Sequence, residues 1–213
     1  MKKMSTLLVI LAFSIGANAQ QRIVAECTIT YAVSAEEANA DKATIESLKS
    51  TVKTVYIKAN RSRVDLISPS YSSSIFYDKT TGNAVSLRES GNNKFISKLD
   101  NAKWKAANKR FDSAVLVNAS ETKVILGYEC KKAELKLKDG NSFTIYYATN
   151  IIPSVKEFEY QFKDVPGFVL EYEYKGQEAN SKKIKYTATK INLSPVQASK
   201  FDVPTSGYRV YDN

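Results

Sequence analysis

The 213-residue sequence contains no histidine, one tryptophan and only two cysteines. The absence of histidine excludes a Ser-His-Asp triad, a Cys-His dyad, histidine-ligated zinc and a proton shuttle through imidazole. No glycine-rich phosphate loop is present, and no cysteine cluster has the spacing of a metal site. The sequence therefore predicts no catalytic residue, no metal ligand and no cofactor, and we expect a protein that is not an enzyme.

Carboxylate pairs are present, but the alternation around them is that of a strand. Glu171 and Glu173 lie two residues apart, and so do Glu157 and Glu159. Glycoside hydrolysis requires such a pair in a cleft at a defined separation. Because these glutamates alternate with apolar residues, we expect both pairs on solvated faces, which makes a hydrolase the least favoured interpretation.

The first nineteen residues have the pattern of a secretory signal peptide. Lys2 and Lys3 precede an unbroken apolar run at residues 7–13, and an Ala-Asn-Ala cleavage motif ends just before Gln20. This run is shorter than the roughly 20 apolar residues that span a bilayer, and no later segment approaches that length. We therefore expect a signal peptide at residues 1–19, one β-rich domain at 20–213, and a protein that is exported and not integral to the membrane.

Basic residues outnumber acidic ones, and the formal net charge is +9. A basic exported protein is suited to anionic envelope surfaces such as phospholipid or glycolipid head groups, and export argues against nucleic acid as a partner. The lysines are also spread along expected strands, where solvated lysines prevent sheets from aggregating edge to edge. Both interpretations of the charge stay open.

The two cysteines, Cys27 and Cys130, would meet an oxidising compartment after export, which permits one disulfide. Cys27 alternates in phase with Ile29 on an apolar face, whereas Cys130 falls in phase with Lys132 on a polar face. The alternation weakens the case for a bridge but leaves it open. A catalytic thiol is disfavoured because no histidine can activate it.

Thirteen tyrosines and nine phenylalanines, with many threonines, valines and isoleucines, favour a β-rich fold. Short alternating segments separated by turn residues predict an antiparallel meander. The strongest hairpin turn is Asp139-Gly140. The expected strands cover residues 22–33, 51–59, 61–67, 73–78, 84–89, 94–99, 131–138, 142–149, 168–175 and 182–193.

Helical patterns interrupt the strands. Residues 34–50 predict either a modest surface helix with Ser34 as its candidate N-cap or a partly ordered insertion between two strands. Residues 100–111 predict a second helix with Asp100 as its N-cap. Trp104 would pack this second helix on the sheet. A third, short helix is expected near the C-terminus.

This number of strands exceeds a flat two-layer plan. We predict a mainly β fold, a single curled antiparallel sheet that forms a half-barrel or open barrel, with two or three helices packed on it. If its own side chains do not fill it, such a cup holds an apolar ligand. The candidate ligand-binding residues are those at inward positions of the C-terminal strands: Leu135, Leu137, Phe143, Ile145, Tyr147, Phe168, Leu170, Tyr172 and Tyr174.

Three segments carry a family resemblance: ILGYECKKA at 125–133, IYYAT at 145–149 and VPGFVL at 165–170. They resemble the GLPGLI-type secreted proteins and a neighbouring family of envelope proteins with a domain of unknown function. The departure from a Trp-Tyr-Thr strand at 146–148 favours the neighbouring family. The resemblance implies an exported protein of the periplasm or cell envelope of a Gram-negative bacterium. By analogy, it implies a half-barrel like that of the lipoprotein carriers LolA and LolB, which hold acyl chains in an apolar cup.

Two functions follow from these expectations. The first is a non-enzymatic carrier or sensor that binds lipid or lipoprotein acyl chains in the cup. The alternative is a structural or interaction protein of the envelope that acts through its outer surface and has a solid core.

Overall fold

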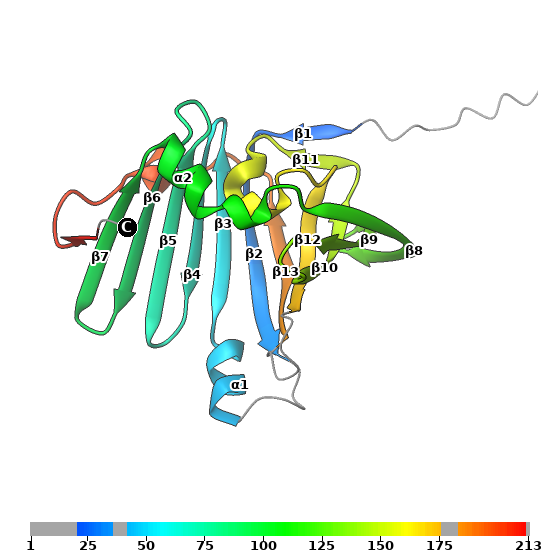
Figure 1. The fold of residues 1–213 in the computed structure, drawn as a ribbon, viewed down its shortest axis with the longest axis horizontal. Helices are drawn as coiled ribbons and strands as arrows, with labels where there is room; N and C mark the ends of the chain where they lie inside the picture. Colours follow the sequence, from blue (N-terminus) through cyan, green and yellow to red (C-terminus); the bar gives the residue numbers. More distant parts are fainter. Residues whose placement is uncertain (1–20, 36–41, 176–182, 212–213) are drawn as a thin grey trace, which may run out of the picture.

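The computed structural model describes residues 21–35, 42–175 and 183–211 (Figure 1). The predicted signal peptide at residues 1–19 lies outside the described residues. Within the described residues, one twelve-stranded sheet has the order β14-β7-β6-β5-β4-β3-β2-β13-β12-β10-β9-β8, and it is open rather than closed into a barrel. The predicted mainly β fold with one curled open sheet is confirmed.

The first half of the sheet is an antiparallel meander that follows the chain order. Its strands are β2 (Glu26–Ala35), β3 (Val52–Lys58), β4 (Arg61–Ile67), β5 (Tyr71–Asp78), β6 (Asn83–Ser90) and β7 (Asn93–Leu99). A purely antiparallel sheet was predicted, but the short β14 (Arg209–Val210) pairs with β7 in parallel, so the sheet is mixed. A separate parallel pair joins β1 (Arg22–Val24) to β11 (Ile151–Pro153).

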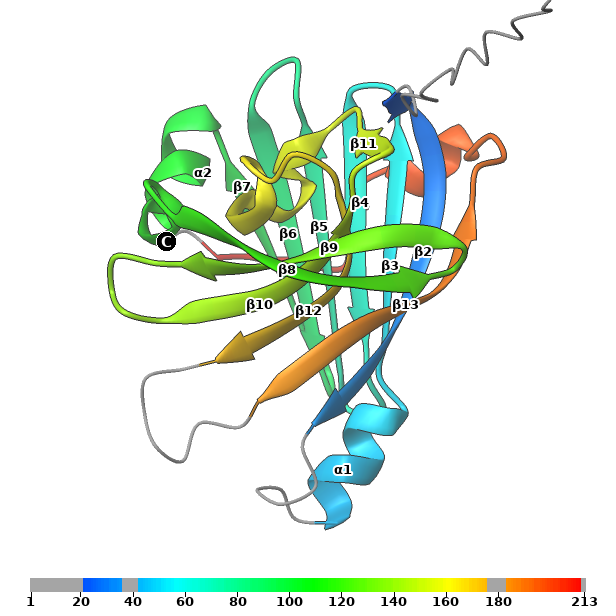
Figure 2. The same ribbon diagram turned by 90° about the vertical axis from the view of Figure 1, so that its right-hand side faces the viewer.

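The second half comprises β8 (Val115–Ile125), β9 (Tyr128–Lys136), β10 (Ser142–Ala148), β12 (Phe168–Lys175) and β13 (Ile184–Asn192). These strands curl across the first half, as Figure 2 shows. Strand β8 is absent from the predicted strands. It is exposed along nearly all of its length, so it lacks the apolar alternation that reveals a half-buried strand.

The helices are short and lie at the two ends of the sheet (Figure 1). Helix α2 (Asn101–Ala107) and the 3₁₀ segments η2 (Lys109–Phe111) and η3 (Lys156–Phe162) sit at one end, and α1 (Lys42–Lys49) sits at the other (Figures 1 and 2). A third 3₁₀ segment, η4 (Ala198–Phe201), lies near the C-terminus.

The two predicted N-caps had different outcomes. Asp100 accepts a hydrogen bond from the backbone N–H of Lys103 at 2.8 Å, which confirms it as the cap of α2. Ser34 is not a cap, because it lies within β2. Residues 36–41 lie outside the described residues, and the described helix α1 covers Lys42–Lys49. The strand pairing of Ser34 with Lys185 extends β2 beyond the point where local helix signals begin.

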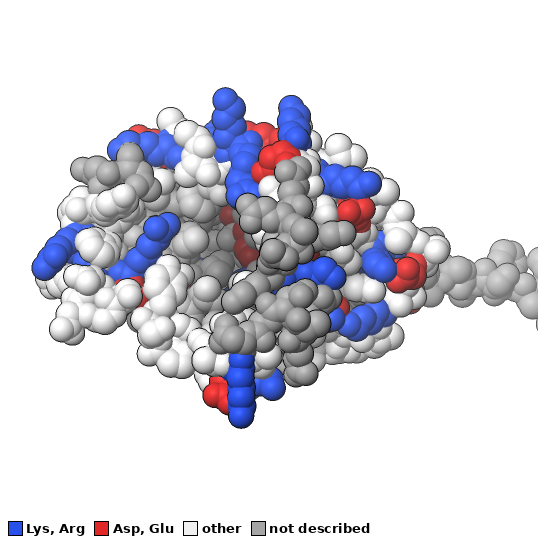
Figure 3. All heavy atoms as spheres, turned by 60° about the horizontal axis from the view of Figure 1, so that its bottom comes forward, with Lys and Arg blue, Asp and Glu red and all other residues white. Residues whose placement is uncertain are grey.

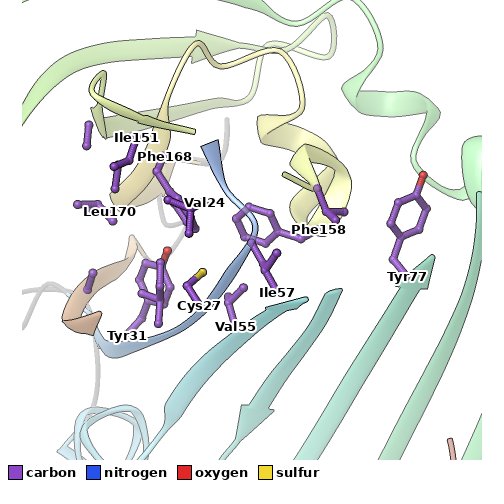
Figure 4. Packing of buried hydrophobic residues seen from close by; sticks show 14 of the residues in the cluster. Val24, Cys27, Tyr31, Val55, Ile57, Tyr77, Ile151, Phe158, Phe168 and Leu170 are labelled. Atoms are coloured by element: carbon purple, nitrogen blue, oxygen red, sulfur yellow. The ribbon is translucent and has the colours of Figure 1, made fainter. Parts of the chain in front are cut away.

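Three clusters of buried side chains form the core. The first cluster joins β2 and β3 to β12 and to Phe158 of η3, as Figure 4 shows. The second cluster joins β9, β10 and β12 to Phe162 of η3. The third cluster lies beneath the C-terminal segment, where Val203 and Tyr208 pack against Phe76, Leu87 and Ile96. Segment η3 thus packs into both of the main clusters and closes one end of the space between the halves.

Candidate functional site

The register of the first half defines its concave face, because directly opposed residues of antiparallel strands lie on the same face. Three cross-strand rows run from β2 to β7. The upper row is Cys27, Ile57, Ser62, Tyr77, Ala84 and Leu99. The middle row is Ile29, Val55, Val64, Ile75, Ser86 and Ser97, and the lower row is Tyr31, Lys53, Leu66, Ser73, Arg88 and Phe95.

The upper row is covered by α2 and η3. Trp104 of α2 packs with its ring centroid 5.7 Å from that of Tyr77, and it meets the ring of Tyr160 of η3 edge-on. Ser62 and Ala84 are buried beneath this layer. This end of the concave face is therefore closed.

The middle and lower rows open toward β7. Ile29 and Val55 are fully buried, but Val64 and Ile75 further along the middle row are only half-buried. In the lower row Leu66 is likewise half-buried. Figure 3 shows the underside of the molecule, which is hollowed between the two halves. The open part of the concave face thus lies over β4–β7.

A buried ion pair lies near the β2 end of the lower row, at Lys53 of β3. The ammonium of Lys53 lies 2.5 Å from a carboxylate oxygen of Glu159 in η3, and their side chains are 4% and 10% exposed. Lys53 also donates a hydrogen bond to the hydroxyl of Tyr172 at 2.8 Å, and that hydroxyl donates to Glu159 at 3.2 Å. Glu159 therefore does not lie on a solvated face as predicted; the η3 turn carries it inward.

Three tyrosine rings surround the Lys53 ammonium, and we call them the tyrosine cage. The centroids of Tyr31, Tyr172 and Tyr186 lie 4.8, 4.7 and 5.4 Å from the nitrogen. Burial lowers the pKa of Lys53, and Glu159 opposes that shift. Burial, with the charge of Glu159, raises the pKa of Tyr31 and Tyr172 well above the ordinary value. Both tyrosines are therefore neutral, and the charge of Lys53 within the tyrosine cage is balanced by that of Glu159.

Lys53, Glu159 and Tyr186 were missed by the sequence analysis. One signal was available for Lys53, because it alternates in phase with Val55 and Ile57 on the apolar face of β3. A lysine at an apolar position indicates a buried partner. Nothing in the local sequence identifies Glu159 as that partner.

The nine predicted ligand-binding residues do not share one cluster. Six lie in the second cluster: Leu135, Leu137, Phe143, Ile145, Tyr147 and Tyr172. Tyr174 is half-buried against that cluster, whereas Phe168 and Leu170 lie in the first cluster. A β-bulge in β12 separates them, because Tyr146 pairs with Glu171 and Tyr147 pairs with Val169. The extra residue, Leu170, breaks the alternation, and Val169 joins the second cluster instead.

These residues pack on one another instead of facing an opening. The ring of Phe143 contacts the rings of Phe111, Phe162 and Tyr174 at centroid distances of 6.4, 5.7 and 5.1 Å. Ile145 and Leu170 are fully buried. Ligand binding by these nine residues stays a prediction, but the open surface of the concave face lies over other strands.

Both cysteines are free and buried. Cys130 lies in the first cluster together with Ala148 and Ile151, so the predicted polar face is covered at this end of β9. Burial raises the pKa of Cys27 to about 12 and that of Cys130 to about 11. Both thiols are protonated at neutral pH, and neither is an activated nucleophile.

Glu171 is buried on the face of β12 opposite to Tyr172, which corrects the predicted solvated face. Its carboxylate contacts the ammonium groups of Lys123 at 2.8 Å and Lys185 at 3.1 Å, and the hydroxyl of Thr187 donates to it at 2.9 Å. Burial acts to raise the pKa of Glu171, but these partners outweigh it and the pKa lies below its ordinary value. The carboxylate is ionised and fully engaged.

Two adjoining pockets lie along β7, one of them against α2, and we call them the edge pockets. One has a volume of about 310 Å³ and is lined by Lys98, Lys103 and Ala107 among others. The other has a volume of about 230 Å³ and is lined by Ser86, Arg88 and Phe95. They share two further lining residues, Ser97 and Tyr211.

Tyr211 is held at the edge of the sheet by its backbone. Its N–H donates to the carbonyl of Ile96 at 2.8 Å, and the hydroxyl of Ser97 donates to its carbonyl at 2.7 Å. Its ring meets the ring of Phe95 edge-on at a centroid distance of 6.2 Å, and the residue is 52% exposed. Tyr211, the residue that follows β14, therefore forms one wall of both edge pockets.

Within the described residues, no group of three or more cysteine, aspartate or glutamate side chains is placed to hold a metal ion. No helix in that same part of the chain is long and apolar enough to cross a membrane.

No family model and no curated protein matches this chain, so the resemblance to the GLPGLI-type families is not confirmed. Solved structures similar to it include PNGF-II in two crystal forms. The first has a TM-score of 0.52 and 13% identity over 88% of this chain and 31% of PNGF-II. The second has a TM-score of 0.50 and 14% identity over 87% and 30%.

Two further similar structures are MucB and a LolA superfamily protein from Nitrosomonas europaea. MucB has a TM-score of 0.43 and 8% identity, over 84% of this chain and 57% of MucB. The LolA superfamily protein has a TM-score of 0.37 and 10% identity, over 84% of this chain and 91% of that protein. This chain spans about a third of the length of PNGF-II, and likeness at such low identity shows the fold alone.

Proposed function

We propose that this chain is an exported, non-catalytic protein of the Gram-negative periplasm or cell envelope, a carrier or sensor that binds lipid or lipoprotein acyl chains. The observation that supports the proposal is the open part of the concave face. There Val64, Leu66 and Ile75 are half-buried on a surface that α2 and η3 close at one end only.

The dimensions of this surface suit an acyl chain. Neighbouring strands lie about 4.8 Å apart, so the middle and lower rows extend about 14 Å from β4 to β7. Their aliphatic residues Val64, Leu66 and Ile75 lie on β4 and β5, at the end away from β7. Each methylene group that such a surface removes from water contributes about 0.8 kcal/mol. A chain laid across the strands therefore binds through many weak contacts and requires no reorganisation of the core.

Export and an envelope location are supported by the N-terminal pattern of basic residues, apolar run and Ala-Asn-Ala motif. The excess of basic residues suits contact with anionic lipid surfaces. The absence of catalysis is supported by the lack of histidine and by the high pKa of both buried thiols. It is also supported by the pairing of the buried carboxylates Glu159 and Glu171 with lysines.

The test uses two neighbouring residues of β4 that point to opposite faces. Leu66 lies in the lower row, and Ile67 is 55% exposed on the other side of the strand. We expect a fluorescent fatty-acid probe to bind the wild type saturably in the micromolar range. Leu66→Asp should weaken binding at least tenfold because it places a charge on the apolar surface. Ile67→Asp should leave it unchanged.

A failure to bind the probe at millimolar protein would contradict the proposal, and so would equal effects of the two substitutions. Cooperative thermal unfolding of each variant shows that it is folded before binding is measured.

A second function is favoured by β8, the terminal strand of the sheet. Val115, Val117 and Val124 on this strand are 59%, 43% and 69% exposed. An exposed edge strand is a template for pairing with an extended segment of another protein. If β8 binds a partner in this way, Val117→Pro should abolish capture of that partner and leave fatty-acid binding intact.

A further inference from the structure

We propose that the ligand is an amphiphile with one acyl chain and an anionic head group, and that the head group binds in the edge pockets. This inference rests on the proposed function and names the chemical class of its ligand. The acyl chain would lie along the middle and lower rows with its end toward β4.

The apolar surface leads directly into the edge pockets. Along the middle row, Val64 and Ile75 are followed by Ser86 and Ser97, and these two serines line the pockets. Two aromatic rings, those of Phe95 and Tyr211, stand beside the serines. The surface thus changes from aliphatic to hydroxyl-bearing and aromatic within two strand spacings, which matches the junction of an acyl chain and its head group.

Among the described residues, the charged side chains that line the edge pockets are all basic. They are Arg88, Lys98 and Lys103, and no described carboxylate lines either pocket. Within the described part of the chain, none of these three side chains forms an ion pair with a carboxylate. A concave site with several unneutralised cations attracts an anion, and the guanidinium of Arg88 offers paired donors that match a carboxylate or phosphate.

Lys53, the other cation of the lower row, sets the orientation of the bound amphiphile. Lys53 is neutralised by Glu159 and enclosed by the tyrosine cage, so it offers no free charge to a ligand. An anionic head group at that end would also meet the carboxylate of Glu159. The head group is therefore stabilised at the β7 end, and the acyl chain extends away from it.

The experiment compares dodecanoate with dodecanol, which have the same chain length and differ in charge. Trp104 is the sole tryptophan, and its helix contributes Lys103 and Ala107 to the pockets, so its fluorescence reports binding there. At pH 8 we expect dodecanoate to bind at least tenfold more tightly than dodecanol. The advantage should shrink as sodium chloride is raised, because salt screens the attraction of partly exposed charges.

The decisive variant is Arg88→Gln/Lys103→Gln. We expect it to lose at least tenfold in affinity for dodecanoate and to keep the wild-type affinity for dodecanol. The matched control is Lys105→Gln, which removes one positive charge from the same helix at a residue that does not line either pocket. It should bind both ligands as the wild type does.

Equal affinity of the wild type for the two ligands would overturn this inference and leave the proposed function standing. An unchanged affinity of the double variant for dodecanoate would also overturn it. Binding of neither ligand by the wild type would overturn the inference and the proposed function together.

Discussion

Lys53 illustrates what a single residue contributes that local sequence does not reveal. Its ammonium is buried, yet it lies within contact of Glu159, the hydroxyl of Tyr172 and three aromatic rings. Bringing two charges into the interior costs several kcal/mol each, and their mutual attraction offsets much of this. Such a pair adds little net stability while it is intact, but removal of one partner strongly destabilises the folded state.

We predict that Lys53→Met lowers the free energy of unfolding by about 3–5 kcal/mol, because Glu159 is left as an uncompensated buried charge. Urea denaturation measures the loss. The control is Lys58→Met on the same strand, where the pair with Glu26 is about a third exposed, and we expect about 0–1 kcal/mol. The double variant Lys53→Met/Glu159→Leu should recover most of the stability. A stable single variant would show that Glu159 finds another partner.

The buried thiol of Cys27 makes the free energy of unfolding depend on pH in the alkaline range. Burial raises its pKa from 9.0 to about 12, so the folded state keeps a proton that the unfolded chain releases. This contribution is fully present below pH 9 and is lost as pH rises from 9 toward 12. We predict that the urea midpoint falls between pH 8.5 and 10.5 and that Cys27→Ala reduces the slope. Parallel pH profiles for the two proteins would contradict this.

At the level of elements, the β12 bulge decides which side chains meet. Strict alternation would place Phe168, Leu170 and Tyr172 together, but the bulge sends the first two into the cluster of Cys27 and Ile29. A bulge is stabilised by pairing with neighbouring strands, and the sequence of β12 alone carries no sign of it. The consequence is that the predicted cup residues fill two separate parts of the core.

We predict that Leu170→Asp abolishes cooperative folding, because Leu170 is fully excluded from solvent and an aspartate there would be unpaired. The same substitution at the half-buried Leu66 should leave a folded protein. Near-ultraviolet circular dichroism and Trp104 fluorescence distinguish the two outcomes. A folded Leu170→Asp variant would mean that the core between β12 and β2 admits water.

At the level of the whole molecule, the two halves of the curled sheet have different surroundings. Segment η3 places Phe158, Tyr160 and Phe162 between the halves and fills the space against β9, β10 and β12. No described segment covers the concave face over β4–β7 in this way along its middle and lower rows. Among the described residues, the uncovered part of the concave face therefore lies in the N-terminal half of the sheet.

We predict that dodecanoate slows amide hydrogen exchange in β5–β7 and α2 and leaves exchange in β9 and β10 unchanged. Hydrogen exchange followed by mass spectrometry measures this, because amides under a bound ligand open less often. Protection confined to β9, β10 and β12 would instead favour the nine residues selected from the sequence as the binding surface.

Local patterns were sufficient for much of the fold. Three features depend on residues close together in the chain. They are the hairpin that turns at Asn60, the hairpin at Asp139-Gly140, and the cap of α2 at Asp100. Alternation identified the buried faces of β2, β9 and β10 for the same reason. The exposed edge strand β8 and the extension of β2 through Ala35 were missed, because strand pairing and exposure decide them.

The sequence by itself determined a mainly β, curled sheet and the apolar character of its strands, because turns and alternation act over a few residues. Only the tertiary structure decided which concave surface stays open. That choice depends on where η3 packs, how the β12 bulge turns its neighbours, and how the chain near Tyr211 returns to β7. These contacts join residues more than a hundred positions apart, such as Lys53 with Tyr172 and Ser97 with Tyr211, and no local pattern encodes such pairings.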